Sequence, residues 1–197
     1  MVFTELMRRR RSRYSLADQL PLSQSEVAKI IEDCVKQTPS AFNSQSARVV
    51  LLEAAAHEQL WQLVKEALQK VVPAENFAPT EEKLKAFAAA YGTILYFDDE
   101  TVVQSFQEKF PLYREHFPQW AQQANGMLQF AVWTALAEVG IGASLQHYNP
   151  LIDAAVAERF HIPAGWKLVA QMPFGTPYAP AQPKTFVPLA QRMRVEK

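Results

Sequence analysis

The sequence has few of the features that mark membrane, secreted or disulfide-bonded proteins. It contains one cysteine in 197 residues, which excludes an internal disulfide framework and fits a reducing compartment. No apolar stretch approaches the roughly 18 residues needed to cross a bilayer, and the basic N-terminus lacks the apolar segment of a secretory signal. The formal net charge is zero, which argues against a surface built for nucleic acid. We therefore expect a cytoplasmic protein with neither a membrane nor a nucleic-acid partner.

Glycine is also scarce, and its placement excludes several nucleotide-binding folds. The six glycines form neither GxGxxG nor GxxxxGK[ST], so the sequence predicts no Rossmann turn and no P-loop. The segment Gly142 to Gln146 resembles GxSxG but lacks the second glycine, which argues against a serine hydrolase. The four histidines have no metal-ligand spacing such as HExxH, so no metal site is expected.

What the sequence does have is enough apolar material for one solid core. Hydrophobic residues make up 49 % of the chain, and a chain of this length buries about 70 % of its unfolded surface. There are no repeats and no low-complexity linker. We expect a single domain over residues 1–197.

Local patterns predict helices separated by isolated strands. Ser23 to Glu26 form a capping box, and Asn149-Pro150 is typical of the start of a helix. The expected helices cover residues 23–35, 58–72, 84–91 (ended by Gly92), 101–110, 120–139 and 150–160, and the expected strands cover residues 48–53, 93–97 and 166–172. Residues 111–118 are expected to form an aromatic-rich loop, and the proline-rich C-terminal tail is expected to pack on a neighbour. Because strands and helices do not alternate regularly, the fold class is α+β.

Arginines cluster near both ends of the chain. Near the N-terminus, five guanidinium groups could hold a phosphate by bidentate contacts. They are Arg8, Arg9, Arg10, Arg11 and Arg13. The alternative is a solvated arm or a weak nucleic-acid patch. Arg192 and Arg194 stand two residues apart, so in an extended tail they would point to the same side, and their alternative is an ordinary solvated terminus.

Two internal stretches have the polar or glycine-rich character of a ligand site. In TPSAFNSQSAR, residues 38–48, the side chains of Ser40, Asn43 and Gln45 suit the edge of a flat heteroaromatic ligand. A loop that merely satisfies its own backbone is the alternative. In Gly140 to Tyr148, glycines would let the backbone approach a ligand, although a plain helix-to-strand connection explains them equally well. Cys34 lies on an apolar helix face and is interpreted as core.

Taken in order, these stretches resemble the nitroreductase family of flavin-dependent oxidoreductases. The resemblance is carried by Arg10-Arg11-Ser12, by Pro39-Ser40-Ala41-Phe42-Asn43-Ser44-Gln45, by Gly140 to Tyr148, and by the basic pair near the C-terminus. The chain departs from the family at Ser46-Ala47, where most relatives have Pro-Trp, and at Tyr14, where a basic residue is frequent.

The resemblance implies an FMN-binding homodimer with two sites at the subunit interface. Its expected fold is α+β, nitroreductase-like, with a central antiparallel or mixed sheet flanked by helices and an extended C-terminal tail packing on the dimer partner. The cofactor-binding residues it implies are Arg10, Arg11, Ser12, Tyr14, Ser40, Ala41, Asn43, Gln45, Leu145, Gln146, His147, Arg192 and Arg194.

The implied activity is ping-pong hydride transfer from NAD(P)H through flavin N5 to a nitroaromatic, quinone or similar oxidised small molecule. No catalytic side chain is required, because the cofactor carries the chemistry. The segment Phe106 to Trp120, with Phe42, would line the acceptor pocket. Two alternatives remain: an FMN-binding regulatory or stress-response protein with little turnover, and a nucleic-acid-binding domain that uses the N-terminal arginines.

Overall fold

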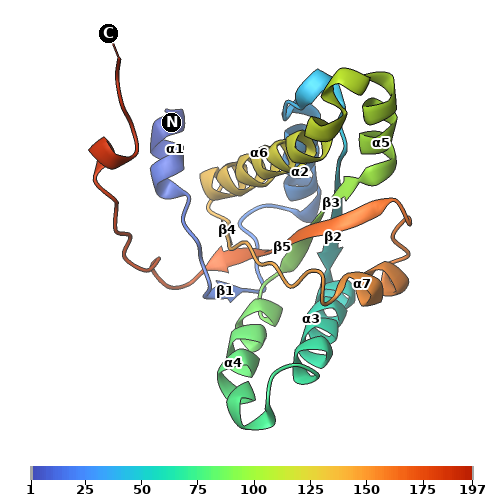
Figure 1. Cartoon of the computed structure of the whole chain (residues 1–197). Helices are drawn as coiled ribbons and strands as arrows, with labels where there is room; N and C mark the ends of the chain where they lie inside the picture. Colours follow the sequence, from blue (N-terminus) through green and yellow to red (C-terminus); the bar gives the residue numbers. More distant parts are fainter. Residues whose placement is uncertain (1, 197) are drawn as a thin grey trace.

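A central antiparallel sheet organises the chain, as Figure 1 shows for the computed structural model, which describes residues 2–196. The strand order is β1-β5-β3-β2, and β4 pairs with β5. The strands are β1 Leu16–Ala17, β2 Ala47–Glu53, β3 Gly92–Asp99, β4 Gly142–Ala143 and β5 Trp166–Pro177. The α+β class with an antiparallel sheet flanked by helices is confirmed.

The central strand β3 is buried on both faces, which follows from its composition of β-branched and aromatic residues. Ile94 and Tyr96 point into one core cluster, whereas Leu95 and Phe97 point into another. This alternation is the period of two that every strand has. The sheet therefore separates two apolar layers.

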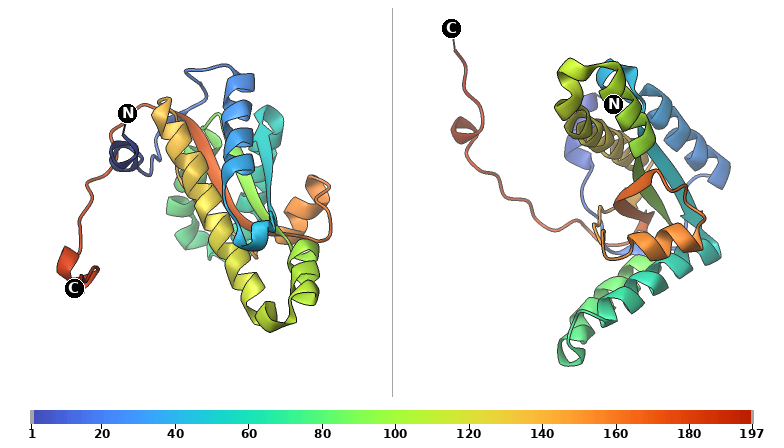
Figure 2. Two further views of the ribbon diagram at one scale, coloured as in Figure 1. Left: turned by 90° about the horizontal axis from the view of Figure 1, so that it is seen from above. Right: turned by 45° about the vertical axis from the view of Figure 1, so that its right-hand side comes forward.

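Helices cover both faces of the sheet (Figures 1 and 2). The first core cluster joins the sheet to α2 and α6, and the second joins it to α3, α4 and α7. The helices are α1 Phe3–Arg9, α2 Gln24–Gln37, α3 Ala54–Gln69, α4 Phe77–Ala88, α5 Glu100–Lys109, α6 Phe117–Glu138 and α7 Asp153–Arg159. Short 3-10 helices are η1 Ala41–Asn43, η2 Ala74–Asn76, η3 Pro111–His116 and η4 Leu189–Gln191. Within residues 2–196, no helix has both the length and the apolar character needed to span a bilayer.

The capping box of α2 is confirmed, but the inward face of this helix is narrower than predicted. Ser23 accepts a hydrogen bond from the backbone N–H of Glu26, and the Glu26 carboxylate accepts one from the Ser23 N–H. Val27 and Ile31 are buried, whereas Val35 is 40 % exposed. The apolar stripe of α2 therefore includes a residue, Val35, that the rest of the chain leaves largely uncovered.

The predicted boundaries of two helices were wrong at both ends, and α4 begins at Phe77, seven residues before the predicted start. Helix α3 begins at Ala54 and ends at Gln69, so Val71, expected to face inward, is 60 % exposed. Helix α4 ends at Ala88, and Gly92 is the first residue of β3 rather than a helix terminator. The reason that position needs glycine is close packing, because a Cβ there would lie 2.7 Å from the Leu52 carbonyl oxygen.

Two predictions around prolines also fail. The aromatic segment 111–118, predicted to be a loop, is helical, because η3 runs directly into α6. Helix α6 starts at Phe117, so Pro118 lies in its first turn, where the missing backbone N–H costs no helical hydrogen bond. Residues 149–152 form turns, and α7 begins only at Asp153, without a side-chain cap from Asn149. By contrast, Gly140 closes α6 at φ +84° as expected.

A buried histidine links α3 to the sheet. The Nδ1 atom of His57 lies 2.9 Å from the Thr93 hydroxyl, which itself accepts a hydrogen bond from Trp61 Nε1. The Ala88 carbonyl can only accept, so the His57 Nε2–H donates to it, and in the neutral ring Nδ1 then accepts from the Thr93 hydroxyl. This arrangement fits neutral imidazole, and burial lowers the pKa of His57, opposed by the Ala88 hydrogen bond.

We expect acid to destabilise the protein through His57. The unfolded chain protonates this residue as the pH falls through about 6.5, while the folded chain resists protonation to a lower pH. The stabilisation by neutral His57 is therefore complete above that pH and is lost progressively below it. Urea unfolding at about pH 7.5 and about pH 5.5 should show a larger drop in unfolding free energy for the wild type than for His57→Gln. An equal drop in both proteins would assign the acid sensitivity to other groups.

After β5 the chain leaves the body of the molecule. Figure 2 shows residues 178–196 extending away from the sheet and helices. Large apolar side chains of this tail are more than half exposed. They are Tyr178, Phe186, Val187, Leu189, Met193 and Val195. A tail of this composition has no core of its own.

Candidate functional site

The polar loop, residues 40–45, has an unusual backbone. Phe42, Asn43 and Gln45 have φ values of 54°, 53° and 52°, in the left-handed region that L-residues other than Asn and Asp seldom adopt. Such strain persists only where the surroundings impose it, and it is frequent at ligand sites.

Hydrogen bonds within the loop impose part of this shape. Ser40 Oγ accepts from the Gln45 N–H at 2.9 Å, and the Ser40 carbonyl accepts from the Asn43 N–H at 2.9 Å. Ser40 thus satisfies local backbone, as the alternative interpretation of this loop anticipated. The exposed side chains of Asn43 and Gln45 remain directed outward, and the only side-chain bond that either makes within residues 2–196 joins Gln45 Nε2 to the Asn43 carbonyl at 3.3 Å.

An aromatic cluster holds the loop at the N-terminal end of α6. Phe42 is half exposed, and its ring centroid lies 4.7 Å from that of Phe110 and 6.1 Å from that of Trp120. Tyr113 and Phe117 complete the ring contacts of Phe42. One face of the cluster is therefore packed, and one edge of it remains accessible beside the polar loop.

An ion pair anchors the other end of the loop. The Arg48 guanidinium donates to the Gln45 carbonyl at 2.6 Å, to the Ala47 carbonyl at 3.1 Å and to Asp99 Oδ2 at 3.0 Å. Burial acts to raise the pKa of the Asp99 carboxyl, but hydrogen bonds from Thr101 and Val102 and the charge of Arg48 outweigh it, so this pKa is lowered. The Asp99 carboxylate is thus ionised and caps α5 as it binds Arg48.

The arginine arm, residues 8–13, lies at the opposite end of α6. The Arg10 guanidinium stacks over Trp133, 4.3 Å from the ring centroid, and its Nε atom is buried without a hydrogen-bond partner among the described residues. Burial and the neighbouring Arg11 lower the pKa of Arg10. An orphaned guanidinium nitrogen of this kind is a ready donor for an anion.

Three arginines of the arm line one cavity. Arg9, Arg11 and Arg13 line a cavity of about 130 Å³ against Trp133 and residues 140–142. Arg11 donates to the Gln182 carbonyl, and Arg13 donates to the Ala179 carbonyl at 3.0 Å, so both also bind the tail. Arg10 and Ser12 have the opposite parity in the extended segment. The prediction placed both Arg10 and Arg11 at one phosphate; in the structure Arg10 stacks on Trp133, and Arg11 lines a cavity beside the same ring.

The glycine-containing segment 142–148 lies beside the arm. The Ala143 carbonyl accepts hydrogen bonds from the Arg13 N–H and from Trp133 Nε1, which ties arm, helix and strand together. The Gln146 N–H is bonded to the Gln171 carbonyl, and the Gln146 side chain is buried and donates to Ser144 Oγ at 3.1 Å. His147 is exposed, whereas Leu145 is partly buried against the first core cluster and Tyr148 against the second.

The predicted C-terminal arginines do not join the arm within one chain. Arg192 and Arg194 lie on the exposed tail, and Arg194 pairs with Glu196. Although the tail runs beside α1 in Figure 1, the views of Figure 2 show its end away from α1. Tyr14 is 47 % exposed at the base of the arm.

Helix α6 therefore separates the two halves of the predicted site. The polar loop contacts Trp120 and the arm contacts Trp133, which are 13 residues apart on a helix that rises about 1.5 Å per residue, or about 20 Å. The sequence pattern named both halves but missed Trp133 and Arg48.

No group of three or more side chains suited to a metal ion occurs within residues 2–196, counting histidine, cysteine, aspartate and glutamate. Cys34 is half-buried, and burial raises the pKa of its thiol, consistent with a packing role. The chemistry of the site thus rests on cationic, amide and aromatic groups.

Known proteins match the chain over nearly its full length. The sequence model of the Nitroreductase family matches residues 7–176. The nitroreductase CinD from Lactococcus lactis, solved in complex with chloramphenicol, is 43 % identical, with 100 % of both chains covered and a TM-score of 0.91. Nitroreductase FRM2 from Saccharomyces cerevisiae is 34 % identical over 184 residues, covering 90 % of this chain and 89 % of FRM2. A protein from Desulfovibrio desulfuricans solved with FMN shares the fold at 19 % identity and a TM-score of 0.73, over 100 % of this chain and 98 % of that one. The chain therefore belongs to the nitroreductase family and is an oxidoreductase of the nitroreductase kind.

Proposed function

We propose that this protein is an FMN-dependent oxidoreductase that uses NAD(P)H to reduce nitroaromatic, quinone or similar oxidised small molecules. The observation that carries the proposal is the pairing of two features. One is a cationic arm with a buried guanidinium nitrogen that has no hydrogen-bond partner among the described residues, and the other is a strained loop that presents two amides. These groups suit the two chemical ends of FMN, namely a phosphate and a flat ring with carbonyl and ring-nitrogen edges. Bound FMN would supply the hydride chemistry at N5 in a ping-pong sequence.

Each half of the site has a defined task in this proposal. Arg10, Arg11 and Ser12 would bind the phosphate, and Asn43 and Gln45 would hydrogen-bond the ring edge and ribityl chain. Leu145 and His147 would flank the ring. The accessible edge of the aromatic cluster would orient a planar acceptor by stacking and would keep water from one side of it.

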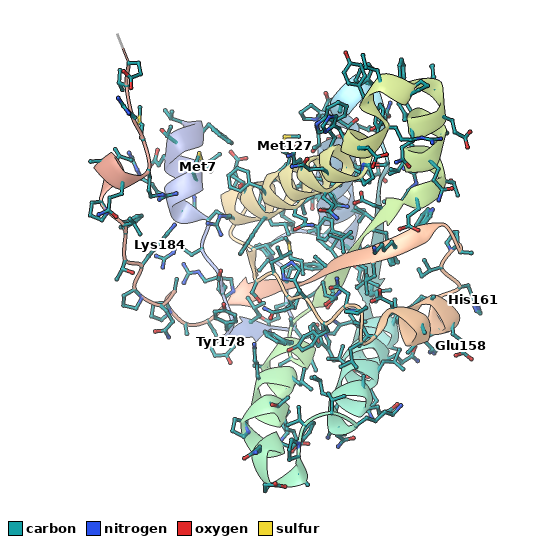
Figure 3. All side chains as sticks on the ribbon, viewed as in Figure 1. Met7, Met127, Glu158, His161, Tyr178 and Lys184 are labelled. Carbon is teal, nitrogen blue, oxygen red and sulfur yellow. The ribbon has the colours of Figure 1, made fainter. Side chains whose placement is uncertain are left out.

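A homodimer would bring the halves together. A second copy packed antiparallel along α6 would place the loop of one protomer beside the arm of the other. The outward face of α6 suits such packing, because Met127 is 45 % exposed and points away from the sheet, and a Cβ at Gly126 would meet nothing within 4 Å (Figure 3). The apolar stripe of α2 continues this surface.

The tail would complete the dimer. Strand β2 is an edge of the sheet, and beside it an apolar groove of about 460 Å³ is lined by residues of α2 and β2 and by Trp166. An edge strand offers unpaired backbone groups to an extended peptide. We propose that the partner's tail occupies this position and carries Arg192 and Arg194 toward the site.

Two complexes of the relative CinD support the acceptor class. Besides chloramphenicol, CinD was solved with 4-nitrophenol, at 43 % identity to this chain and a TM-score of 0.90. The aromatic cluster around Phe42 offers the stacking surface that such electron-poor rings favour.

The purified protein provides the first test. We expect a yellow sample that releases FMN on denaturation, and steady oxidation of NAD(P)H when a nitroarene or quinone is added. A yellow protein without turnover would favour the regulatory alternative. A colourless protein that binds DNA or RNA with steep salt dependence would favour the nucleic-acid alternative.

The polar loop has its own prediction. In the double variant Asn43→Gly with Gln45→Gly, both amides are removed, while glycine accepts the positive φ values without strain. Losing two hydrogen bonds should weaken FMN binding about thirtyfold, because each is worth about 1 kcal/mol. Fluorescence titration of the apoprotein measures this change. Wild-type affinity in the double variant would place these amides outside the site.

A further inference from the structure

We propose that the Arg48–Asp99 ion pair is a latch that holds the polar loop in its ligand-binding shape before any ligand arrives. The latch consists of these two side chains and the Gln45 and Ala47 carbonyls that Arg48 binds. Its consequence for affinity rests on the proposed function, since FMN is taken to be the ligand of the loop. The effect of the latch on the order of the loop does not depend on which ligand binds there.

The geometry shows why the loop needs such a device. Within residues 40–45, three residues have φ near +53°, a conformation that costs free energy at each position. The loop's own hydrogen bonds fix Asn43, Ser44 and the Gln45 N–H, but they leave the Gln45 carbonyl without a partner inside the loop. Arg48 supplies that partner at 2.6 Å and thereby fixes the chain on the far side of the strained residue.

Arginine suits this place because its planar fork makes several bonds at once. One nitrogen reaches both carbonyls, while the other reaches Asp99 Oδ2 at 3.0 Å. The side chains are only 28 % and 12 % exposed, and the Arg48 guanidinium lies 5.8 Å from the Trp166 ring centroid. This pair is therefore more shielded from solvent than an ordinary surface ion pair.

Asp99 connects the latch to the acceptor side of the site. Its other oxygen, Oδ1, accepts from the Thr101 N–H at 3.0 Å and caps α5, and its N–H donates to the Ser46 carbonyl at 2.9 Å. Helix α5 carries Phe106, and Phe110 at its end contacts Phe42. One ion pair thus fixes the loop relative to the helix that supports the aromatic cluster.

Two single variants and their combination test the latch. Arg48→Met keeps the apolar stem but removes the fork. Asp99→Asn removes the charge but keeps a good helix cap. We expect each to weaken FMN binding to the apoprotein about tenfold, and the double variant to be no weaker than either, because the two residues act as one unit. Lys29→Met is the matched control, since it breaks an exposed ion pair on α2 and should leave the affinity unchanged.

Amide hydrogen exchange of the apoprotein supplies a readout that needs no ligand. In Arg48→Met we expect faster exchange confined to the amides of residues 43–47 and of Asp99, whose N–H donates to the Ser46 carbonyl, with the amides of residues 92–97 and of β5 unchanged. Exchange that accelerates across the sheet, or not at all, would overturn the proposal, as would wild-type FMN affinity in Arg48→Met. If the wild type bound no FMN, the proposed cofactor would be wrong, and the exchange pattern would still decide whether the latch exists.

Discussion

Replacing Arg10 by alanine is expected to weaken FMN binding by at least about a hundredfold. The Arg10 guanidinium has a buried nitrogen without a hydrogen-bond partner in residues 2–196 and is held in place by stacking on Trp133. A fork of this kind makes two charge-assisted hydrogen bonds to a phosphate, each worth about 1.5–3 kcal/mol. Titration of FMN into the apoprotein measures the loss, and Arg8→Ala, on the exposed side of α1, is the control expected to bind normally.

Riboflavin distinguishes loss of the phosphate contact from general damage to the arm. Riboflavin has the same ring and ribityl chain but no phosphate, so its affinity should be nearly equal in the wild type and in Arg10→Ala. An equal loss for both ligands would mean that Arg10 supports the fold of the arm rather than the phosphate.

Introducing a charge on the outward face of α6 should have the second large effect. Met127 is 45 % exposed in the single chain, so Met127→Glu should leave the protomer folded. In a dimer packed along α6 the carboxylate would be buried without a partner, at a cost of about 3–5 kcal/mol. We expect the dimer to dissociate at concentrations where the wild type is dimeric, and FMN to be lost with it because each half-site alone binds weakly.

Light scattering after gel filtration, combined with flavin absorbance, measures both quantities. Val71→Glu is the matched control, because Val71 is exposed at the end of the α3 segment, away from α6. A Met127→Glu protein that stays dimeric and yellow would move the interface to another surface.

Much of the fold could be predicted from the sequence, because the sequence patterns that specify helices and strands are local. The β-branched run at 93–97 predicted the centre of β3, and Ser23 with Glu26 predicted the start of α2. The predictions failed where tertiary contacts decide. Gly92 looked like a helix terminator but serves close packing against β2, and Asn149-Pro150 looked like a helix start but lies in a turn.

Part of the candidate site was also predicted from local sequence patterns. The sequence named the arm and the loop because their residue types are distinctive. It did not predict the positive φ values of Phe42, Asn43 and Gln45, which depend on Ser40 and Arg48. Nor did it predict that Arg10 would stack on Trp133, because the two are 123 positions apart in the sequence and meet only through the fold.

Mixing two defective proteins tests the split site most directly. Arg10→Ala damages only the arm, and the double variant Asn43→Gly with Gln45→Gly damages only the loop. If arm and loop come from different chains, unfolding and refolding an equal mixture should restore wild-type FMN affinity at about a quarter of the sites, since half the dimers are mixed and each holds one intact site. If no high-affinity sites appear in the mixture, each site is built from a single chain and the account is contradicted.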